Sequence, residues 1–526
     1  MTITELQQQY AAHPNTAVME RLLKDASVQT IFCGGLCASS ASLFSSVLVK
    51  QDVCPFVFVL GDLEEAGYFY HDLTQVLGTE KVLFFPSSFR RSIKYGQKDT
   101  ANEILRTEVL SRLQKGEEGL CIVTYPDALA EKVVSRKELS DKTLKLNVGE
   151  KLDTTFITDV LHSYGFEYVD YVYEPGQYAV RGSIIDVFSF ASEYPYRIDF
   201  FGDEVESIRT FEVESQLSRE RKEGVAIVPD LAVTGDVTTS FLDFIPKETV
   251  LAMRDFLWLR ERIQVVHDEA LTPQAIAVQE AEENGGITLE GKLIDGSEFT
   301  VRALDFRRME FGNKPTGTPD AKISFHTSVQ PIFHKNFDLV AGSFKDYLEQ
   351  GYSLYICSDS TKQTDRIRAI FEDRGDKIQF TPVVRTIHEG FVDHTLHLCI
   401  FTDHQLFDRF HKYNLKSDKA RSGKVALSLK ELNQFTPGDY VVHTDHGIGR
   451  FSGLVRIPNG DTTQEVLKLV FQNEDVVFVS IHSLHKVSKY KGKDGEAPRL
   501  NKLGTGAWEK LKDRTKAKIK DIARDL

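Results

Sequence analysis

The chain lacks the features that mark several whole classes of protein. Its six cysteines form no Cys-x-x-Cys pair and mostly lie within apolar runs, so buried, reduced thiols are expected in place of a disulfide framework. No window approaches about 18 uninterrupted apolar residues, and the polar N-terminus has no apolar signal core. These absences predict a cytoplasmic protein without a membrane span.

An overall excess of basic residues is also missing. Lys and Arg number 64 and Asp and Glu number 77, which gives a net charge of −13 at pH 7. Bulk electrostatics therefore oppose binding to DNA, RNA and anionic membranes, and any contact with nucleic acid must be local. A local basic excess occurs at residues 486–526, with 13 basic and 6 acidic side chains. That stretch is either a solvated helix face or a contact with nucleic acid.

The remaining composition is typical of a multidomain globular protein. The 526 residues are 41% hydrophobic and 27% charged, and at roughly 100–200 residues per domain they form about three to five domains. Short apolar runs alternate with amphipathic segments in the first 124 residues, which predicts a parallel α/β sheet. The expected strands are 30–33, 56–61, 82–86 and 120–124, and the expected helices include 66–77 and 102–113.

The pattern changes several times further along the chain. From about residue 164 the apolar spacing becomes two, with turn signals between the runs, which predicts an inserted domain of antiparallel strands. A mixed α/β pattern then returns, with a helical stretch at 272–283, and ends in a Gly/Pro/Thr cluster at 313–319. Beyond it, helices at 343–350 and 362–373 and strands at 353–358 and 396–402 predict a second, small α/β domain.

The last residues form an amphipathic helix that runs to the end of the sequence. Apolar side chains recur at spacings of three and four from Trp508 to Leu526, and no Gly or Asn cap follows them. We therefore expect the chain to be part of a longer protein.

A turn near the N-terminus has the layout of a phosphate-binding loop without its chemistry. Such a loop needs Gly-x4-Gly-Lys-Ser/Thr between a strand and a helix, because backbone amides, Lys and a hydroxyl hold the phosphates and magnesium. Here the turn begins at Gly34, Ser39 stands at the second Gly, Ser40 at the Lys and Ala41 at the magnesium ligand. The turn is predicted to be an inactive relic that does not bind ATP.

No other catalytic or metal site can be assembled from the sequence. His443 and His446 lie three residues apart, but no third and fourth ligand lies nearby, so hydrogen-bonding turn histidines are expected instead of a zinc site. The scattered serines show no nucleophile elbow. We expect no catalytic site, metal or cofactor in this segment.

Two motifs carry a specific family resemblance. The stretches EPGQYAVRGSIIDVF at 174–188 and YRIDFFGDEVESIR at 196–209 resemble a region shared by UvrB and the bacterial transcription-repair coupling factors (Mfd). The stretch PGDYVVHTDHGIGRFSG at 437–453 is similar to the RNA-polymerase-interacting module of that family and of CarD-like proteins. With LGTGAWEK at 503–510, the resemblance to transcription-repair coupling factors covers essentially the whole chain.

The resemblance implies an adaptor that works with a motor. Members of the family bind stalled RNA polymerase through its β subunit, displace it with an ATP- and magnesium-dependent superfamily 2 DNA translocase, and recruit UvrA for nucleotide excision repair. The motor's motifs are absent here, so the translocase, which makes the main contact with double-stranded DNA, is expected beyond residue 526. We expect the segment to be monomeric.

Patterning and resemblance together predict a multidomain α/β and α+β protein. The expected parts are a UvrB-like α/β domain at 1–124 and 213–312, an inserted β-rich UvrA-binding domain at 125–212, a small α/β domain at 325–410, a linker at 411–434, a small CarD/Tudor-like β barrel at 435–497 and a linker helix at 503–526.

The family's UvrA-contacting positions correspond to Arg181, Arg197 and Phe201. Arginines beside an aromatic residue are typical of interface hot spots. The alternative is that Phe201 belongs to the core and that the arginines pair with Asp199 or Glu204.

Polymerase binding is assigned to Leu454, Arg456 and Ile457. Their run follows a glycine-rich turn and could offer a strand edge to the β subunit, with Ile457 in a pocket. The alternative is a protected barrel rim, because Pro458 follows directly.

Two other functions remain open from the sequence. The chain could be a stand-alone CarD-like regulator that binds RNA polymerase but not UvrA. It could also be an ATPase or nuclease that uses the first α/β domain, although the missing Lys of the phosphate loop disfavours this reading.

Overall fold

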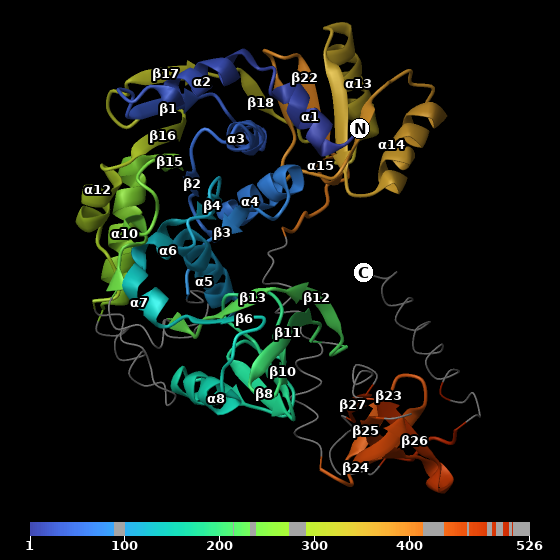
Figure 1. Ribbon diagram of the computed structural model, residues 1–526. Coiled ribbons are helices and arrows are strands. Elements are labelled where there is room, and N and C mark those ends of the chain that lie inside the picture. Colours follow the sequence, from blue (N-terminus) through green and yellow to red (C-terminus); the bar gives the residue numbers. More distant parts are fainter. Residues whose placement is uncertain are drawn as a thin grey trace. The chain divides into compact units, whose positions relative to one another are not determined.

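The computed structural model describes most of the chain as two compact units. The described residues are 1–88, 100–213, 215–231, 238–272, 291–413, 436–459, 462–480, 487–490, 498–503 and 508. The first unit comprises Met1–Lys142 and Asp230–Asp418, and the second comprises Thr143–Pro229 and Lys419–Leu526 (Figure 1). In the part of the chain that is described, no helix is both long and apolar enough to cross a membrane.

A seven-stranded parallel sheet forms the centre of the first unit. Its order is β17-β1-β16-β15-β2-β4-β3, and every neighbouring pair is parallel. The bounds are β1 Thr30–Gly34, β2 Phe56–Val59, β3 Val82–Phe84, β4 Cys121–Thr124, β15 Val250–Met253, β16 Arg307–Gly312 and β17 Ala321–Ser324. Each of β2, β3, β4 and β15 is buried along its whole length, which explains why these strands are continuously apolar. The predicted parallel α/β sheet is confirmed.

Helices and short elements surround this sheet. Asp62 and Asp255 accept hydrogen bonds from backbone amides in the first turns of α4 and α10, which fixes where these helices begin. Helix α3 packs against α4, and α10 packs against α6 and α12. The bounds are α1 Ile3–Tyr10, α2 Pro14–Lys24, α3 Ser40–Lys50, α4 Leu63–Leu77, α5 Thr100–Gln114, α6 Pro126–Ala130, β5 Val133–Val134, α7 Arg136–Asp141, β14 Thr238–Thr239, η1 Phe241–Asp243, α10 Phe256–Ala270 and α12 Gly296–Ala303.

The small α/β domain of the first unit is built on a five-stranded sheet of order β18-β21-β22-β19-β20. Its strands are β18 Thr327–Val329, β19 Ser353–Ser358, β20 Thr381–Val384, β21 Phe391–Asp393 and β22 Leu398–Thr402, and its helices are α13 Phe337–Glu349, α14 Thr361–Asp373 and α15 Asp403–Leu406. Helix α13 begins six residues before the predicted helix, because the Asn336 side chain accepts hydrogen bonds from two backbone amides and caps it.

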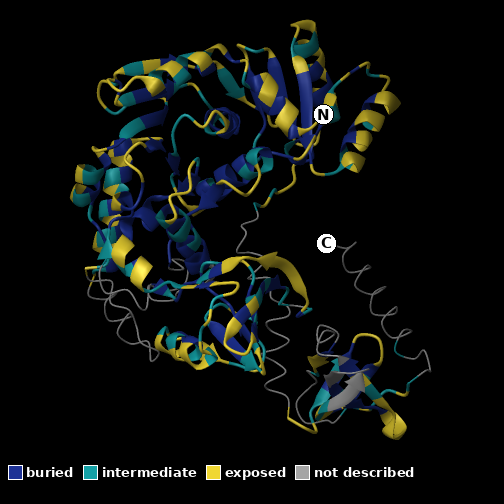
Figure 2. Ribbon diagram, viewed as in Figure 1, coloured by how far each residue is buried: buried dark blue, intermediate teal, exposed yellow. Residues whose placement is uncertain are grey.

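A six-stranded sheet carries the first part of the second unit. Its order is β12-β11-β10-β9-β8-β7, and only the β7–β8 pair is parallel. The elements are β6 Leu144–Asn147, α8 Thr154–Ser163, β7 Glu167–Tyr168, β8 Gln177–Arg181, β9 Ile184–Val187, β10 Tyr196–Phe201, β11 Glu204–Phe211, β12 Ser218–Lys222 and β13 Gly224–Ile227. Gly202 turns the chain between β10 and β11 with φ +66°, as the sequence pattern predicts. One face of the sheet is buried in an apolar core, whereas β12 is exposed along its length (Figure 2).

The last described domain is a small antiparallel sheet of order β26-β25-β24-β23-β27. Its elements are β23 Tyr440–His443, β24 Gly447–Asn459, β25 Thr462–Val470, η2 Gln472–Glu474, β26 Val476–Ser480 and β27 Val487–Lys489. It is consistent with the predicted CarD-like domain, and the overall mixture of α/β and antiparallel elements is confirmed. The predicted domain boundaries remain a prediction.

Three predicted elements lie almost wholly outside the described residues. They are the helix at 272–283, the linker at 411–434 and the terminal helix at 503–526. Within the last of these, Trp508 is described, and its indole Nε1 donates a hydrogen bond to the Thr444 carbonyl at 2.8 Å.

Candidate interaction surfaces

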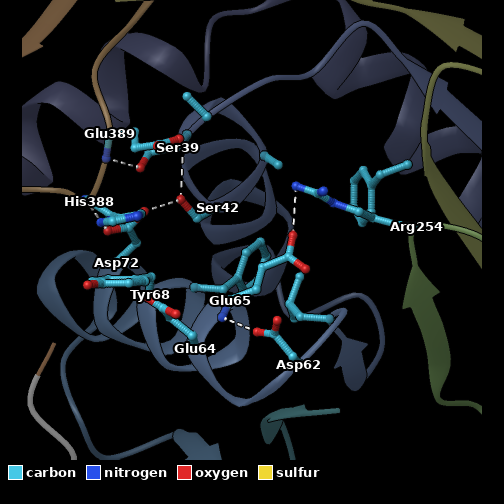
Figure 3. A pocket seen from close by; sticks show the side chains of 15 residues that line it. Ser39, Ser42, Asp62, Glu64, Glu65, Tyr68, Asp72, Arg254, His388 and Glu389 are labelled. Atoms are coloured by element: carbon cyan, nitrogen blue, oxygen red, sulfur yellow. Dashed lines mark hydrogen bonds and ion pairs between the residues drawn. The ribbon is translucent and has the colours of Figure 1, made fainter. Parts of the chain in front are cut away.

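The turn at residues 34–41, which the sequence predicts to be an inactive phosphate-binding loop, connects β1 to α3, and its polar groups are paired within the chain. The Cys37 amide donates to Ser40 Oγ at 2.8 Å, and Ser40 Oγ donates to the Cys37 carbonyl at 2.5 Å. The Glu389 amide donates to Ser39 Oγ at 2.9 Å (Figure 3). A Cβ atom placed on Gly35 would lie 2.0 Å from the Phe325 carbonyl oxygen, so backbone covers the turn closely. The Phe325 carbonyl, the Thr327 hydroxyl and the Glu389 amide thus contact the turn and cover it.

An acidic cavity of about 330 Å³ lies beside this turn. Figure 3 shows Asp62, Glu64, Glu65 and Glu389 among its lining residues. The Arg254 guanidinium also lines it and lies 2.7 Å from Glu65 Oε1, so this positive charge is already paired. Polyphosphate binding is disfavoured because the carboxylates outnumber the cation. Sequence analysis did not single out this acidic lining.

Asp72 is a buried carboxylate that also lines this cavity. It accepts hydrogen bonds from Ser42 Oγ and from the His388 amide, both at 2.7 Å. Burial raises the pKa of the Asp72 carboxyl to about 6. The side chain therefore links α3 and α4 to the loop before β21 with part of its charge suppressed near neutral pH.

Two of the predicted UvrA-contacting residues converge on one buried carboxylate. Arg197 on β10 lies directly opposite Asp186 on β9, with Nε 2.8 Å from Oδ1 and Nη2 2.9 Å from Oδ2. Arg181, at the end of β8, also donates to Asp186 Oδ2. The Asp186 side chain is fully buried, whereas the arginine side chains remain 34% (Arg181) and 17% (Arg197) exposed. The carboxylate thus fixes both guanidiniums at the surface of the sheet.

Aromatic rings and carbonyls hold the two guanidiniums further. The guanidinium of Arg197 lies 4.5 Å from the centre of the Phe211 ring, and its Nη1 donates to the Gln216 carbonyl at 3.0 Å. The guanidinium of Arg181 lies 5.1 Å from the centre of the Tyr171 ring. Both arginines are therefore positioned before any partner arrives.

Phe201 ends β10, and 80% of its surface is exposed. It does not belong to the core, which removes one part of the alternative raised by the sequence. The alternative also pairs the two arginines with Asp199 or Glu204. In the structure both arginines pair with Asp186 instead, and Asp199 lies 3.8 Å from Arg209. The sequence signal for Asp186 is an aspartate inside an otherwise apolar strand.

The predicted polymerase-binding residues lie on the long strand β24. Its register pairs Leu454 with Leu467, Arg456 with Glu465 and Ile457 with Gln464 on β25. On its other side, β23 pairs with Gly447–Arg450, and the backbone of Gly438 and Asp439 hydrogen-bonds to Phe451. In the described part of the chain, no strand covers that edge from residue 452 onward. Leu454 is 44% exposed, and the side chains of Arg456 and Ile457 lie outside the described set.

Comparison with known proteins agrees with this arrangement. A family model described as the UvrB interaction domain matches residues 144–232, and one described as the CarD-like/TRCF RID domain matches residues 435–491. The transcription-repair-coupling factor of Staphylococcus aureus (strain bovine RF122 / ET3-1) is 24% identical over 561 residues, covering 94% of this chain and 48% of the relative. That of Bacillus subtilis (strain 168) is 23% identical over 571 residues with the same coverage. The chain is similar to transcription-repair-coupling factors over nearly its whole length.

The resemblance predicted from the sequence motifs is thereby confirmed. The chain spans about half the length of the transcription-repair-coupling factors that it matches. Arg181, Arg197 and Phe201 lie inside the first matched family region, and Leu454, Arg456 and Ile457 lie inside the second. The assignment of these six residues to partners stays a prediction.

The two turn histidines of the second matched region stack on each other. The ring centroids of His443 and His446 are 4.5 Å apart, and His443 Nδ1 accepts a hydrogen bond from the Asp445 amide at 3.1 Å. Among the residues that the structure describes, no group of three or more His, Cys, Asp or Glu side chains is arranged to hold a metal ion.

A cluster of four histidines in the first unit was missed by sequence analysis. His71 lies on α4, His388 before β21, His404 on α15 and His411 just beyond it. The His404 and His411 rings stack with centroids 4.4 Å apart, and the His71 and His411 ring centroids are 5.1 Å apart. Each of the four carries a buried ring nitrogen with no hydrogen-bond partner among the described residues. Burial lowers the pKa of His71, His388 and His404 to about 4, so the rings are neutral at pH 7.

Proposed function

We propose that the chain supplies the partner-binding part of a transcription-repair-coupling factor. In this role it binds UvrA through Arg181, Arg197 and Phe201 and the β subunit of RNA polymerase through the edge of β24. The observation that carries the proposal is the exposed Phe201 on the same strand as an arginine that a fully buried Asp186 holds in place.

The UvrA-binding part of the proposal rests on the chemistry of protein interfaces. An aromatic side chain exposed to 80% gains apolar burial when a partner covers it. Guanidiniums that are already oriented lose little conformational entropy on binding, and Arg and aromatic residues dominate interface hot spots. A purely structural role would account for the buried Asp186 but leaves the exposure of Phe201 unexplained.

The polymerase-binding part rests on the uncovered edge of β24. Backbone amides and carbonyls on such an edge can pair with a strand of another protein, and neighbouring side chains then select the partner. Leu454 is a half-exposed apolar side chain on this strand and suits such a contact.

ATP-driven translocation along double-stranded DNA, with its magnesium requirement, is proposed for the part of the family protein that this chain does not span. The relic turn supports this division, because its groups are paired internally and the adjoining cavity is acidic. The chain itself is proposed to hydrolyse no ATP.

The test uses the full 526-residue chain, purified UvrA and purified RNA polymerase β subunit. Binding to each partner is measured by pull-down, and ATP hydrolysis is measured in the same samples. We expect capture of both partners without hydrolysis, loss of UvrA by the Arg181→Ala/Arg197→Ala variant, and unchanged capture of β by that variant.

The other outcomes separate the alternatives. Capture of β without UvrA would favour a CarD-like regulator. Hydrolysis that is abolished by changing Ser39 or Ser40 would favour an ATPase. Undiminished UvrA capture by the double variant would refute the assignment of the two arginines.

A further inference from the structure

A row of basic side chains continues across the sheet beyond the residues assigned above. In the strand register, Arg197 on β10 lies opposite Arg209 on β11, and Arg209 lies opposite Arg221 on β12. Directly opposed residues of antiparallel strands project from the same face of a sheet. With neighbouring strands about 4.8 Å apart, Arg221 stands roughly 10 Å from Arg197 along this row.

This row lies on the face of the sheet that is turned away from the main core. Ile198 and Ile208 are the next residues along β10 and β11, are paired with each other and are buried in the core. Side chains alternate between faces along a strand, so the arginines occupy the opposite face. Lys222 is paired with Ile208 and therefore projects to the core side of the exposed edge strand β12.

The two outer arginines differ from the inner pair because no buried carboxylate holds them among the residues that the structure describes. Arg209 donates to Ser207 Oγ at 3.0 Å and lies 3.8 Å from Asp199 Oδ2, and its side chain is 34% exposed. Arg221 is exposed on β12, the edge strand of the sheet. Both guanidiniums remain accessible to a partner.

The charge of this face contrasts with that of the whole chain. In the register, the row runs from Asp186 through Arg197 and Arg209 to Arg221, so it holds three arginines and one aspartate, whereas the whole chain carries a net charge of −13. The carboxylates of Asp199 and Glu204 lie further along the same face. A local positive surface on an acidic protein suits a partner whose opposing surface is acidic, because complementary potentials steer the encounter and fix the register.

We propose that the UvrA-docking surface extends from Phe201 and Arg197 across β11 and β12 to Arg209 and Arg221, and that UvrA presents carboxylates opposite these two side chains. The inference rests on the proposed function, since it enlarges the same surface. Phe201 at the end of β10 favours a protein partner over DNA, because an exposed aromatic side chain beside guanidiniums suits an apolar socket rimmed by carboxylates.

Charge reversal in the full chain tests the extension. The affinity for purified UvrA is measured by isothermal titration calorimetry at two salt concentrations for the unchanged chain and for R209E, R209Q, R221E and K222E. The K222E variant is the matched control, because it makes the same charge change on the same strand but on the other face. We expect R209E and R221E each to weaken binding about tenfold, R209Q to weaken it less, and K222E to stay within about twofold. The salt dependence is expected to fall in R209E and R221E.

Each outcome has a distinct meaning. If the Arg181→Ala/Arg197→Ala variant loses UvrA binding while R221E and R209E bind like the unchanged chain, the surface ends at β10 and the extension is wrong, although the proposed function stands. If R221E and K222E weaken binding equally, the effect is one of bulk charge and the extension is again wrong. If the unchanged chain fails to bind UvrA, the proposed function is overturned and the extension with it. If the variants lose affinity for duplex DNA and keep it for UvrA, the arginine row serves nucleic acid instead.

Discussion

At the scale of single residues, Asp186 determines the geometry of the candidate UvrA surface. Its fully buried carboxylate accepts hydrogen bonds from both Arg181 and Arg197, which come from different strands. Removing one member of such a cluster leaves the others with unsatisfied groups. Both arginines keep some solvent contact, however, so their loss of a partner is screened in part.

For Asp186→Asn we expect the free energy of unfolding to fall by about 1–3 kcal/mol, because the amide keeps the volume but loses the charge that both guanidiniums share. UvrA affinity is expected to fall with it, because the guanidiniums lose their fixed orientation. Urea unfolding and calorimetric titration measure the two effects. The role of Asp186 in positioning would be refuted if the variant were less stable but bound UvrA as tightly as before.

Phe201→Ala is expected to weaken UvrA binding while leaving the stability of the chain almost unchanged. Since the ring is 80% exposed, its removal changes the free energy of unfolding by less than about 0.5 kcal/mol. UvrA binding is expected to weaken by about 2 kcal/mol or more, as for a hot-spot aromatic residue. Phe156→Ala serves as a control, because Phe156 is another exposed aromatic residue of the same unit and lies on α8, away from the assigned surface. Equal losses of affinity in both variants would show that general apolar exposure, and not Phe201, drives binding.

At the scale of elements, the turn between β1 and α3 is laid out like a nucleotide-binding site. The chain's own side chains and backbone occupy that space and pair with its polar groups. Ser40 is fully buried and hydrogen-bonded to both backbone groups of Cys37. A lysine side chain placed there would enter a space already occupied by the strand-turn-helix junction.

Restoring the sequence of a phosphate loop is therefore not expected to restore ATP binding. The triple variant Ser39→Gly/Ser40→Lys/Ala41→Thr should lose about 2 kcal/mol or more of unfolding free energy, because it buries an ammonium group without a partner. Thermal unfolding with and without ATP and magnesium measures both effects. Ala41→Ser alone is the control and should change stability little. An ATP-dependent rise in the unfolding midpoint of the triple variant would contradict the view that the chain's own groups occupy the turn.

Helices and strands were predictable from the sequence where a local pattern of apolar residues alone determines them. The strands β1, β2, β3 and β4 are short apolar runs between amphipathic helices, and burial on both sides of a parallel sheet requires that pattern. The start of α13 was not predictable from hydrophobic spacing, because the Asn336 cap sets it. The pairing of both arginines with Asp186 depends on the strand register, and Asp199 and Glu204 were equally plausible partners without it.

At the scale of the whole first unit, the histidine cluster joins segments that are far apart in the sequence. His71 belongs to the large α/β part, whereas His388, His404 and His411 belong to the small α/β domain and its end. Sequence analysis missed the cluster because no local spacing connects these positions. Tyr68 stacks on His388 with ring centroids 3.4 Å apart and extends the contact along α4. Protonating these rings would place positive charges in a buried contact between the two parts.

The cluster predicts that acid destabilises the first unit. Burial first, and mutual repulsion second, lower the pKa of His71 and His388 to about 4, whereas an unfolded histidine titrates near pH 6.5. Between about pH 6.5 and 4 the unfolded chain therefore binds more protons than the folded chain, and stability falls as the pH falls through this window. Asp72 and Glu103 oppose the trend, because burial raises the pKa of Asp72 to about 6 and that of Glu103 above its ordinary value, so that their folded forms take up protons in the same window. With three histidines lowered to about 4, the histidine effect is expected to dominate theirs.

Thermal unfolding of the full chain at pH 7 and pH 5 measures this balance. We expect a lower unfolding midpoint at pH 5 than at pH 7. The difference is expected to be smaller in His71→Phe, which keeps a ring but cannot be protonated, and larger in Asp72→Asn, which removes one of the opposing groups. The control His326→Gln changes an exposed histidine of the same unit and should leave the difference unchanged. Equal midpoints at the two pH values, or equal responses of His71→Phe and His326→Gln, would mean that the buried cluster does not couple proton uptake to the contact between α4 and the small α/β domain.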